Sequence, residues 1–120
     1  MIKNSLISII ILNYNGGQII QDCIESIYKT TKAEFEIILI DNNSIDSSDK
    51  ECKEKFPQIN LIGNNENTGM TARNIGIDNS KGDFIVFLDS DTIVKPEWLT
   101  NFLDSYNEHG EGLYQPKFLE

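Results

Sequence analysis

Two acidic residues with one residue between them, Asp89 and Asp91, directly follow the apolar run Phe84–Leu88. In an extended segment such residues point to the same side, so both carboxylates are expected to face one crevice while Ser90 points away. Two buried like charges about 4 Å apart repel by roughly 4 kcal/mol at an effective dielectric constant near 20. A hard divalent cation relieves that repulsion, and Mg²⁺ or Mn²⁺ is commonly held by one or two carboxylates plus substrate phosphates. The pair therefore predicts a Mn²⁺ or Mg²⁺ site, with a solvated turn as the alternative.

Polar and glycine-rich clusters follow the other apolar runs of the chain. They occupy Asn13–Gly17, Asp41–Ser44 and the two stretches Asn67–Gly69 and Arg73–Gly76. In an open parallel sheet, ligands bind beyond the carboxyl ends of the strands, where the strand order reverses. These clusters are therefore expected to line one crevice with the acid pair. Each one alone also fits an ordinary turn, because Asn, Asp, Gly and Ser favour turns.

Four isoleucine-rich apolar runs are the expected strands that carry these clusters, namely Leu6–Leu12, Phe35–Ile40, Ile59–Ile62 and Phe84–Leu88. Their hydrophobicity is continuous rather than alternating, which is typical of parallel strands buried on both faces. Helical patterns separate the runs, and a regular alternation of strand and helix predicts right-handed crossovers. The sequence thus predicts a single α/β domain over residues 1–120, with a mostly parallel sheet and helices on both faces.

The expected helices have recognisable starts, stops or apolar stripes. The first carries an apolar stripe at three- and four-residue spacing, formed by Ile20, Ile24, Ile27 and Tyr28. The others are expected at about 46–56, 71–80 and 96–110. Ser44 is expected to cap the second helix and Gly82 to end the third. Pro96 is expected in the first turn of the fourth, which ends near Gly110.

Composition and charge exclude several classes of protein. The 10 basic and 19 acidic residues give a net charge of −9, which opposes binding to nucleic acid or to an anionic membrane surface. The longest apolar run, Leu6–Leu12, is too short to span a bilayer. Cys23 and Cys52 have no zinc-ligand spacing and are expected as small core residues in a reducing cytoplasm, with one long-range disulfide left open.

Three familiar nucleotide or metal motifs are missing from the chain. It contains neither the dinucleotide-binding pattern G-x-G-x-x-G nor the phosphate-binding pattern G-x-x-x-x-G-K-[ST]. A calcium loop starting at Asp41 fails, because its sixth position is Asp46 rather than glycine and its closing glutamate position is Cys52.

The motifs together resemble those of the family 2 glycosyltransferases, which have the GT-A fold. The matching blocks, in order and spacing, are SIIILNYN (8–15), ILIDNNSID (38–46), NTG (67–69), ARNIG (72–76) and GDFIVFLDSD (82–91). Two departures stand out. The segment Asp41–Ser44 keeps only the first acid of the family's Asp-Asp-Gly-Ser block, and Leu12-Asn13 replaces a common Pro-Thr pair.

The resemblance implies a role for individual residues in binding a nucleotide-diphosphate sugar. Asp41 would accept a hydrogen bond from N3–H of a uracil-type base, and Arg73 would lie near the base and ribose. Asp89 would approach the ribose or the water shell of the metal, and Asp91 would coordinate the cation that bridges the diphosphate. The donor-binding residues implied in this way are Leu12, Asn13, Tyr14, Asn15, Asp41, Asn43, Asn67, Gly69, Arg73, Asp89 and Ser90.

The same resemblance implies that the chain is the donor-binding part of a longer enzyme. Family members continue well beyond the metal motif, and that later part supplies the acceptor site and the catalytic base. Here the chain ends at Glu120, and Gly112–Lys117 resembles the entry to the family's next strand. No catalytic base is expected among these residues, and His109, which has no partner in the pattern, is assigned no role.

The function expected from these observations is metal-dependent, inverting transfer of a sugar from a UDP- or dTDP-type donor to the hydroxyl of a saccharide or lipid-linked acceptor. The location expected is cytoplasmic, with any membrane contact made through the remainder of the protein or its partners. One alternative is a non-catalytic nucleotide-sugar-binding or assembly module, with its sheet edge covered by a second copy or a partner. A remote alternative is a haloacid-dehalogenase-like phosphatase, with Asp89 as nucleophile and Asp91 as acid/base.

Overall fold

The computed structural model describes residues 5–110, so the stretch Gly112–Lys117 lies outside the described residues. Its strands are β1 (Leu6–Asn13), β2 (Glu34–Asp41), β3 (Asn60–Gly63) and β4 (Phe84–Leu88). They form a four-stranded parallel sheet in the order β3-β2-β1-β4. The predicted α/β class with a parallel sheet is confirmed. Since the chain runs outward from β1 to β3 and then returns to the other side of β1, the strand order reverses between β1 and β4.

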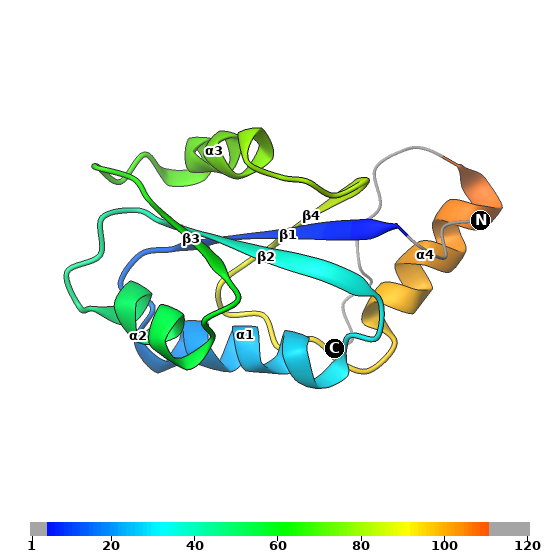
Figure 1. The fold of residues 1–120 in the computed structure, drawn as a ribbon, viewed down its shortest axis with the longest axis horizontal. Helices are drawn as coiled ribbons and strands as arrows, with labels where there is room; N and C mark the ends of the chain where they lie inside the picture. Colours follow the sequence, from blue (N-terminus) through cyan, green and yellow to red (C-terminus); the bar gives the residue numbers. More distant parts are fainter. Residues whose placement is uncertain (1–4, 111–120) are drawn as a thin grey trace.

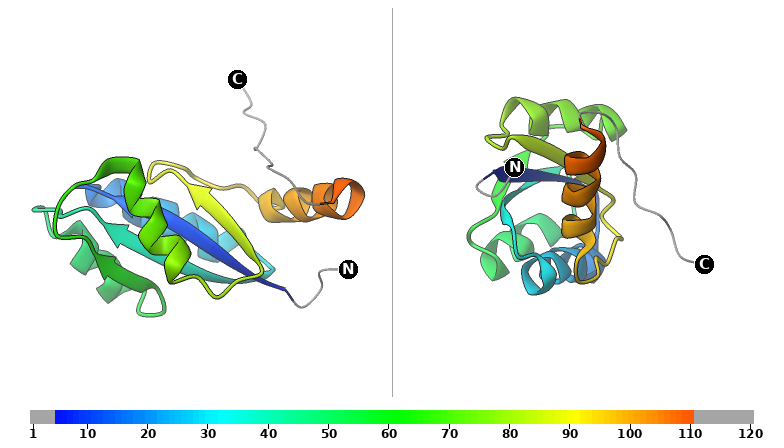
Figure 2. Two further views of the ribbon diagram at one scale, coloured as in Figure 1. Left: turned by 90° about the horizontal axis from the view of Figure 1, so that it is seen from above. Right: turned by 90° about the vertical axis from the view of Figure 1, so that its right-hand side faces the viewer.

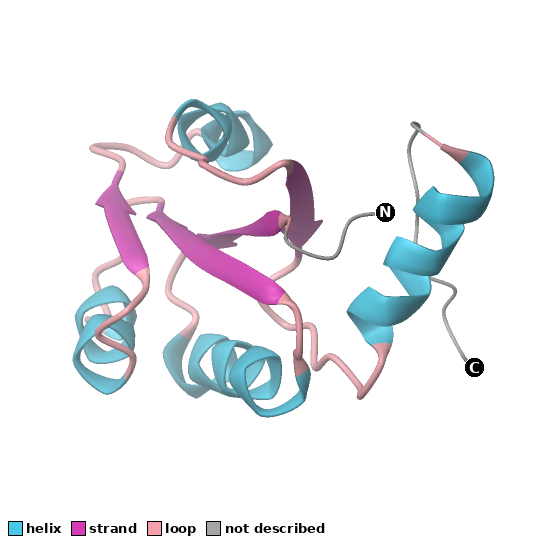
Figure 3. Ribbon diagram, turned by 45° about the vertical axis from the view of Figure 1, so that its right-hand side comes forward, coloured by secondary structure: helices cyan, strands magenta, loops and turns pink. Residues whose placement is uncertain are grey.

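Helices cover both faces of the sheet, as predicted (Figure 1). Helices α1 (Gly17–Thr30) and α2 (Ser48–Lys55) lie on one face, and the 3₁₀ turn η1 (Gly69–Ala72) with α3 (Arg73–Asp78) lies on the other. Helix α4 (Trp98–His109) stands at one end of the sheet (Figures 2 and 3), where Phe84 at the start of β4 meets Phe102 and Tyr106 edge-on. Among the described residues, no helix has the length and apolar character needed to cross a membrane.

The core consists of two layers, one on each face of the sheet. On the α1 face, isoleucines of β1 and β2 pack against buried residues of α1 and α2, forming a cluster that includes Ile7, Ile9, Ile11, Ile37, Ile20, Ile24 and Cys52. On the α3 face, Ile10 packs with Ile38, Ile40 and Ala72. Neighbouring residues of a strand point to opposite faces, so the parts of β1 and β2 that are covered on both faces are apolar without interruption, over residues 9–12 and 37–40. Both cysteines are buried and free, as expected for core residues.

The outer strands depart from the prediction that every strand is buried on both faces. In β4 the residues of one face contact the α1 layer, whereas Ile85 and Phe87 on the other face are 38% and 39% exposed. Strand β3 contains no buried residue. The apolar run therefore predicted the strands correctly, but it did not distinguish the two central strands from the edge strands.

The predicted start of α2 is wrong, and the reason is a competing hydrogen bond. Ser44 does not cap the helix, because its hydroxyl and its backbone N–H both donate to the carboxylate of Asp41. Helix α2 begins at Ser48, after Ser47 with a positive φ of 67°. Asp and Ser side chains that bond to nearby backbone favour such turns over helix.

Two other predicted helix boundaries also need correction. The helix expected at 71–80 is a 3₁₀ turn followed by α3, which ends at Asp78 and not at Gly82. Gly82 instead packs against β1, where a Cβ would lie 2.7 Å from the backbone nitrogen of Ser8. Helix α4 begins at Trp98, so Pro96 precedes the helix, whereas Gly110 follows its last residue as predicted.

Candidate functional site

A cavity of about 450 Å³ lies at the carboxyl ends of β1 and β4, where the strand order reverses. Ligand sites in open α/β sheets occur at this position, and the volume falls within the usual range for small-molecule pockets. The lining residues come from the ends of both strands, from the start of α1 and from the η1–α3 segment. They are Leu12, Asn15, Gly16, Ile19, Met70, Arg73, Leu88, Asp89, Ser90 and Asp91.

Asp89 and Asp91 line this cavity, but not for the reason predicted. They lie in a turn rather than an extended segment, because the Thr92 backbone N–H donates to the Asp89 carbonyl at 3.0 Å. Ser90, expected to point away, also lines the cavity. Both acids are exposed, and the side chain of Asp89 is 76% exposed. Because water surrounds both carboxylates, their mutual repulsion is weaker than that expected for a buried pair.

Arg73, at the start of α3, brings a positive charge to the same wall of the cavity. Its Nη2 lies 3.6 Å from Oδ1 of Asp89, and its guanidinium lies 4.7 Å from the centre of the Phe87 ring. A guanidinium over an aromatic face at this distance gains a cation–π attraction. Phe87 thus supports Arg73 from the exposed face of β4. Sequence reasoning missed this contact, because residues 14 apart on different elements give no local signal.

Asp41 and Asn13 are paired across β1 and β2 and lie outside the cavity lining. Asp41 is 4% exposed, and its Oδ1 accepts hydrogen bonds from Asn13 Nδ2 at 2.9 Å and from the Ser44 hydroxyl at 2.7 Å. Its Oδ2 accepts the Ser44 backbone N–H at 2.9 Å. Asn13 also donates to the buried Ser48 hydroxyl at 2.8 Å. These two residues therefore form a buried network that holds the loops after β1 and β2.

The β1–α1 and β2–α2 loops are joined directly through Asn15, which lines the cavity. Its backbone N–H donates to the Ser44 hydroxyl at 2.9 Å, and its Oδ1 accepts the Ile45 backbone N–H at 2.8 Å. Asn15 adopts a positive φ of 52°, a conformation that Asn tolerates better than most residues. The cross-loop bonds therefore fix the position of Asn15 at the rim of the cavity.

The structure brings together only part of the predicted donor site. Leu12, Asn15 and Arg73 share the cavity with the turn formed by Asp89, Ser90 and Asp91, called the acid turn below. Six predicted residues do not line the cavity, namely Asn13, Tyr14, Asp41, Asn43, Asn67 and Gly69. Of these, Gly69 directly precedes Met70, which lines the cavity, and its carbonyl accepts a hydrogen bond from Asn42 Nδ2 at 3.3 Å. Gly16, which belongs to the cluster Asn13–Gly17, lines the cavity as expected, whereas sequence reasoning missed Ile19, Met70 and Leu88. These three are apolar side chains without a chemical motif to reveal them.

The acid turn has donor groups suited to a hard divalent cation. Carboxylate oxygens are the ligands that Mg²⁺ and Mn²⁺ prefer, and Mg²⁺ usually completes its shell with water and substrate phosphates. Within residues 5–110 the structure contains no group of three or more His, Cys, Asp or Glu side chains placed to hold a metal. Asp89 and Asp91 can supply two carboxylates, so they fit a cation that takes its remaining ligands from water or from a bound molecule.

Cys23 of α1 lies directly behind the acid turn. Its Sγ is 3.8 Å from the Asp89 carbonyl oxygen, within reach of a weak S–H···O hydrogen bond. Burial, and to a smaller extent the negative charge of Asp91, raise the pKa of the Cys23 thiol to about 12. The thiol is therefore protonated at neutral pH and has neither the charge nor the exposure of a reactive cysteine.

Fold and site together define an α/β architecture with a cavity at the point where the strand order of a parallel sheet reverses. The family model described as glycosyl transferase family 2 matches residues 8–119. The chain therefore belongs to glycosyl transferase family 2, and the resemblance read from its motifs is confirmed. The phosphatase hypothesis gains no support from this family assignment.

Curated relatives are glycosyltransferases that extend well beyond the matched region. Glycosyltransferase GlyG of Streptococcus pneumoniae is 36% identical over 109 residues, which cover 88% of this chain and 36% of GlyG. The putative glycosyltransferase EpsH of Bacillus subtilis is 33% identical over 100 residues, covering 81% of this chain and 29% of EpsH. The chain thus spans about a third of the length of these relatives.

Solved structures with the same fold are GT-A glycosyltransferases, which confirms the predicted GT-A architecture. Residues 1–349 of Staphylococcus aureus TarS in complex with UDP superpose with a TM-score of 0.75 at 25% identity, covering 91% of this chain and 38% of TarS 1–349. The mannosyltransferase PcManGT of Pyrobaculum calidifontis, in complex with GDP-Man and Mn²⁺, has a TM-score of 0.77 at 21% identity and covers 85% of this chain and 32% of PcManGT. The latter likeness concerns the fold alone.

Proposed function

We propose that this chain is the donor-binding part of an enzyme that transfers a sugar from a UDP- or dTDP-type nucleotide to a hydroxyl of a saccharide or lipid-linked acceptor. One observation carries the proposal: Asp89, Asp91 and Arg73 line the same cavity, at the point where the strand order of the sheet reverses. The TarS complexes with UDP and UDP-GlcNAc support this donor class.

Asp91, with Asp89, would hold a Mn²⁺ or Mg²⁺ ion against the diphosphate. When bound, such an ion neutralises the negative charge that builds on the diphosphate as the sugar departs. A diphosphate approaching a chain of net charge −9 at two carboxylates would otherwise be repelled. Arg73 would add a fixed positive charge on the same side, in a geometry suited to phosphate oxygens.

The remaining lining residues would position the nucleoside and sugar. The apolar side chains of Leu12, Ile19 and Met70 offer a surface for the flat faces of the base and ribose. We propose Asp41 as the acceptor of a hydrogen bond from N3–H of the base. In the structure Asp41 is 4% exposed and does not line the cavity. We assign no catalytic base within the described residues, and propose that the acceptor site, the base and inversion at the anomeric carbon belong to a further part of the protein.

Calorimetric titration of UDP into the chain, with Mn²⁺ present and after chelation with EDTA, tests the proposal. We expect binding in Mn²⁺ and at least about a tenfold weaker affinity in EDTA, since a charge-assisted contact of about 1.5–3 kcal/mol is lost. UMP should show a much smaller Mn²⁺ effect, because it lacks the second phosphate. Titrations with dTDP and GDP then separate pyrimidine from purine preference.

Asp91→Asn provides the variant, and Asp104→Asn on the exposed surface of α4 provides the matched control. Both remove one carboxylate, but only the first touches the cavity. Asp91→Asn should abolish most of the difference between Mn²⁺ and EDTA, while Asp104→Asn should keep it. If UDP binds equally well after chelation, the metal-dependent donor site is refuted.

A further inference from the structure

We propose that Ser26, in the middle of α1, is a positioning residue that holds the acid turn in place for the bound cation. The inference rests on the proposed function of Asp89 and Asp91. Ser26 does not line the cavity and is 8% exposed. Its hydroxyl accepts the Val94 backbone N–H at 3.1 Å in a buried contact, and Val94 itself is 7% exposed.

The segment between β4 and α4 needs such support, because it has few backbone partners of its own. Strand β4 ends at Leu88 and α4 begins at Trp98, so the residues between them lie beyond the sheet ladder. Among the described residues, the backbone–backbone hydrogen bonds of this segment outside the sheet join Thr92 to Asp89, Trp98 to Lys95 and Asn101 to Glu97, so they reach no element other than α4. The polar contacts that tie the segment to the α1 side of the sheet therefore involve side chains.

Helix α1 supplies these side chains on both flanks of the acid turn. Cys23 Sγ lies 3.8 Å from the Asp89 carbonyl, at the first residue of the turn, and Ser26 accepts the N–H of Val94, after it. Further along, Thr31, which caps the end of α1, accepts the indole N–H of Trp98, the first residue of α4, at 2.9 Å. The three contacts follow α1 in order along the same segment. The helix thus fixes where the two carboxylates stand, although none of its three polar groups touches them.

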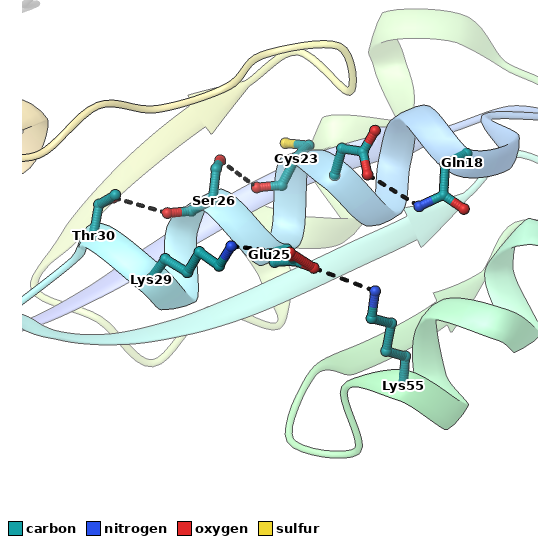
Figure 4. Close-up of polar contacts among 8 residues, drawn as sticks. Gln18, Cys23, Glu25, Ser26, Lys29, Thr30 and Lys55 are labelled. Carbon is teal, nitrogen blue, oxygen red and sulfur yellow. Dashed lines mark hydrogen bonds and ion pairs between the residues drawn. The ribbon is translucent and has the colours of Figure 1, made fainter.

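The local hydrogen bond of Ser26 explains how its oxygen is oriented. The Ser26 hydroxyl donates to the Cys23 carbonyl one turn earlier at 2.7 Å, a contact visible in Figure 4. A hydroxyl can donate once and still accept, so this bond leaves a lone pair for Val94. A serine that only satisfies its own helix makes the first bond and lacks the second. The second bond, to a residue 68 positions away, is what links α1 to the acid turn.

The test compares Ser26→Ala with Ser26→Thr, which keeps the hydroxyl, in calorimetric titrations of UDP in the presence of Mn²⁺. Thr30→Val is the matched control, since Thr30 lies on the same helix and its hydroxyl donates only to the Ser26 carbonyl at 2.8 Å, as drawn in Figure 4. We expect Ser26→Ala to weaken binding about tenfold, the lower end of the loss when support behind metal ligands is removed. Ser26→Thr should recover most of the affinity, and Thr30→Val should bind like the unsubstituted chain.

A double-mutant cycle with Asp91→Asn separates positioning from general loosening of the fold. If Ser26 acts through the acid turn, Ser26→Ala should have no further effect once Asp91 has been replaced. An equal loss on both backgrounds, or no loss on either, overturns the inference. Circular dichroism checks that each variant folds, and Cys23→Ala replaces Ser26→Ala in the same cycle if the latter does not. If the unsubstituted chain shows no Mn²⁺-dependent binding of UDP, the proposed function is overturned and this inference with it. If that binding is normal and Ser26→Ala leaves it unchanged, this inference alone is overturned.

Discussion

Replacing Arg73 by Gln should change the binding of free Mn²⁺ and of UDP in opposite directions. Arg73 lies 3.6 Å from Asp89 in an ion pair and is supported by the Phe87 ring. While the pair is intact, the guanidinium competes with any cation for the Asp89 carboxylate. Once Arg73 is gone, Asp89 is released to bind Mn²⁺, but the diphosphate loses a positive partner.

The exposure of the pair sets the size of the first effect. At 3.6 Å the Coulomb attraction is about 1 kcal/mol in a water-like dielectric and about 5 kcal/mol at an effective value of 20. The lower figure applies, because the Asp89 side chain is 76% exposed and measured exposed pairs contribute roughly 0.2–1 kcal/mol. Affinity for free Mn²⁺ should therefore rise by at most about fivefold. Loss of a charge-assisted contact of about 1.5–3 kcal/mol should weaken UDP binding in Mn²⁺ by roughly 10- to 150-fold.

Electron paramagnetic resonance of unbound Mn²⁺ measures the first affinity, and calorimetry with UDP measures the second. Lys81→Gln is the control, because it removes one positive charge from an exposed residue that precedes β4 and does not line the cavity. Its effect on Mn²⁺ binding reports the change in net charge alone. A fall in Mn²⁺ affinity on replacing Arg73, or a rise no larger than that of Lys81→Gln, would refute the proposed competition for Asp89.

Two further predictions concern the scaffold. Gly82→Ala should lower the free energy of unfolding by about 1–3 kcal/mol, because the new Cβ would press on the Ser8 backbone. Gly63→Ala is the control and should change stability little, because the space around Gly63 is open. Equal midpoints of urea unfolding for the two variants would contradict this prediction. Burial raises the pKa of Cys23 to about 12 and of Cys52 to about 11, so the unfolded chain loses its thiol protons first and stability should fall as pH rises from about 9 to 12. Urea unfolding at pH 7.5 and pH 10.5 should show a smaller decrease for Cys52→Ala than for the unsubstituted chain, and an equal decrease would contradict it.

Strand positions could be predicted from the sequence because burial on both faces leaves a continuous apolar run. The runs around Ile9 and Ile38 mark β1 and β2, each flanked by helices on both sides of the sheet. The same pattern could not show that Phe87 is partly exposed, since an edge strand and a central strand have similar composition. Which strands lie at the edge depends on the order β3-β2-β1-β4, which is a property of the whole fold.

The acid turn shows why the site was predicted in composition but not in geometry. The acids Asp89 and Asp91 were identified from their residue types and their place after a strand. Their turn conformation depends on local closure by Thr92 and on contacts of the following segment with α1, far away in sequence. Ser44 failed as a helix cap for a similar reason, because Asp41 offers its hydroxyl a nearer acceptor. Hydrogen bonds of this kind depend on the folded arrangement and produce no periodic pattern in the sequence.

The position of β4 at the edge of the sheet has a consequence for local unfolding of the protein. Strand β1 is hydrogen-bonded on both sides, whereas β4 is bonded only to β1 among the described strands and has two large side chains partly in solvent. Amide protons of β1 and β2 should therefore exchange with deuterium far more slowly than those of β4, whose detachment needs only a sub-global fluctuation. A ligand that spans the ends of β1 and β4 would stabilise the more weakly attached strand. The first detectable effect of its binding should therefore be slower deuterium exchange of the amide protons of β4.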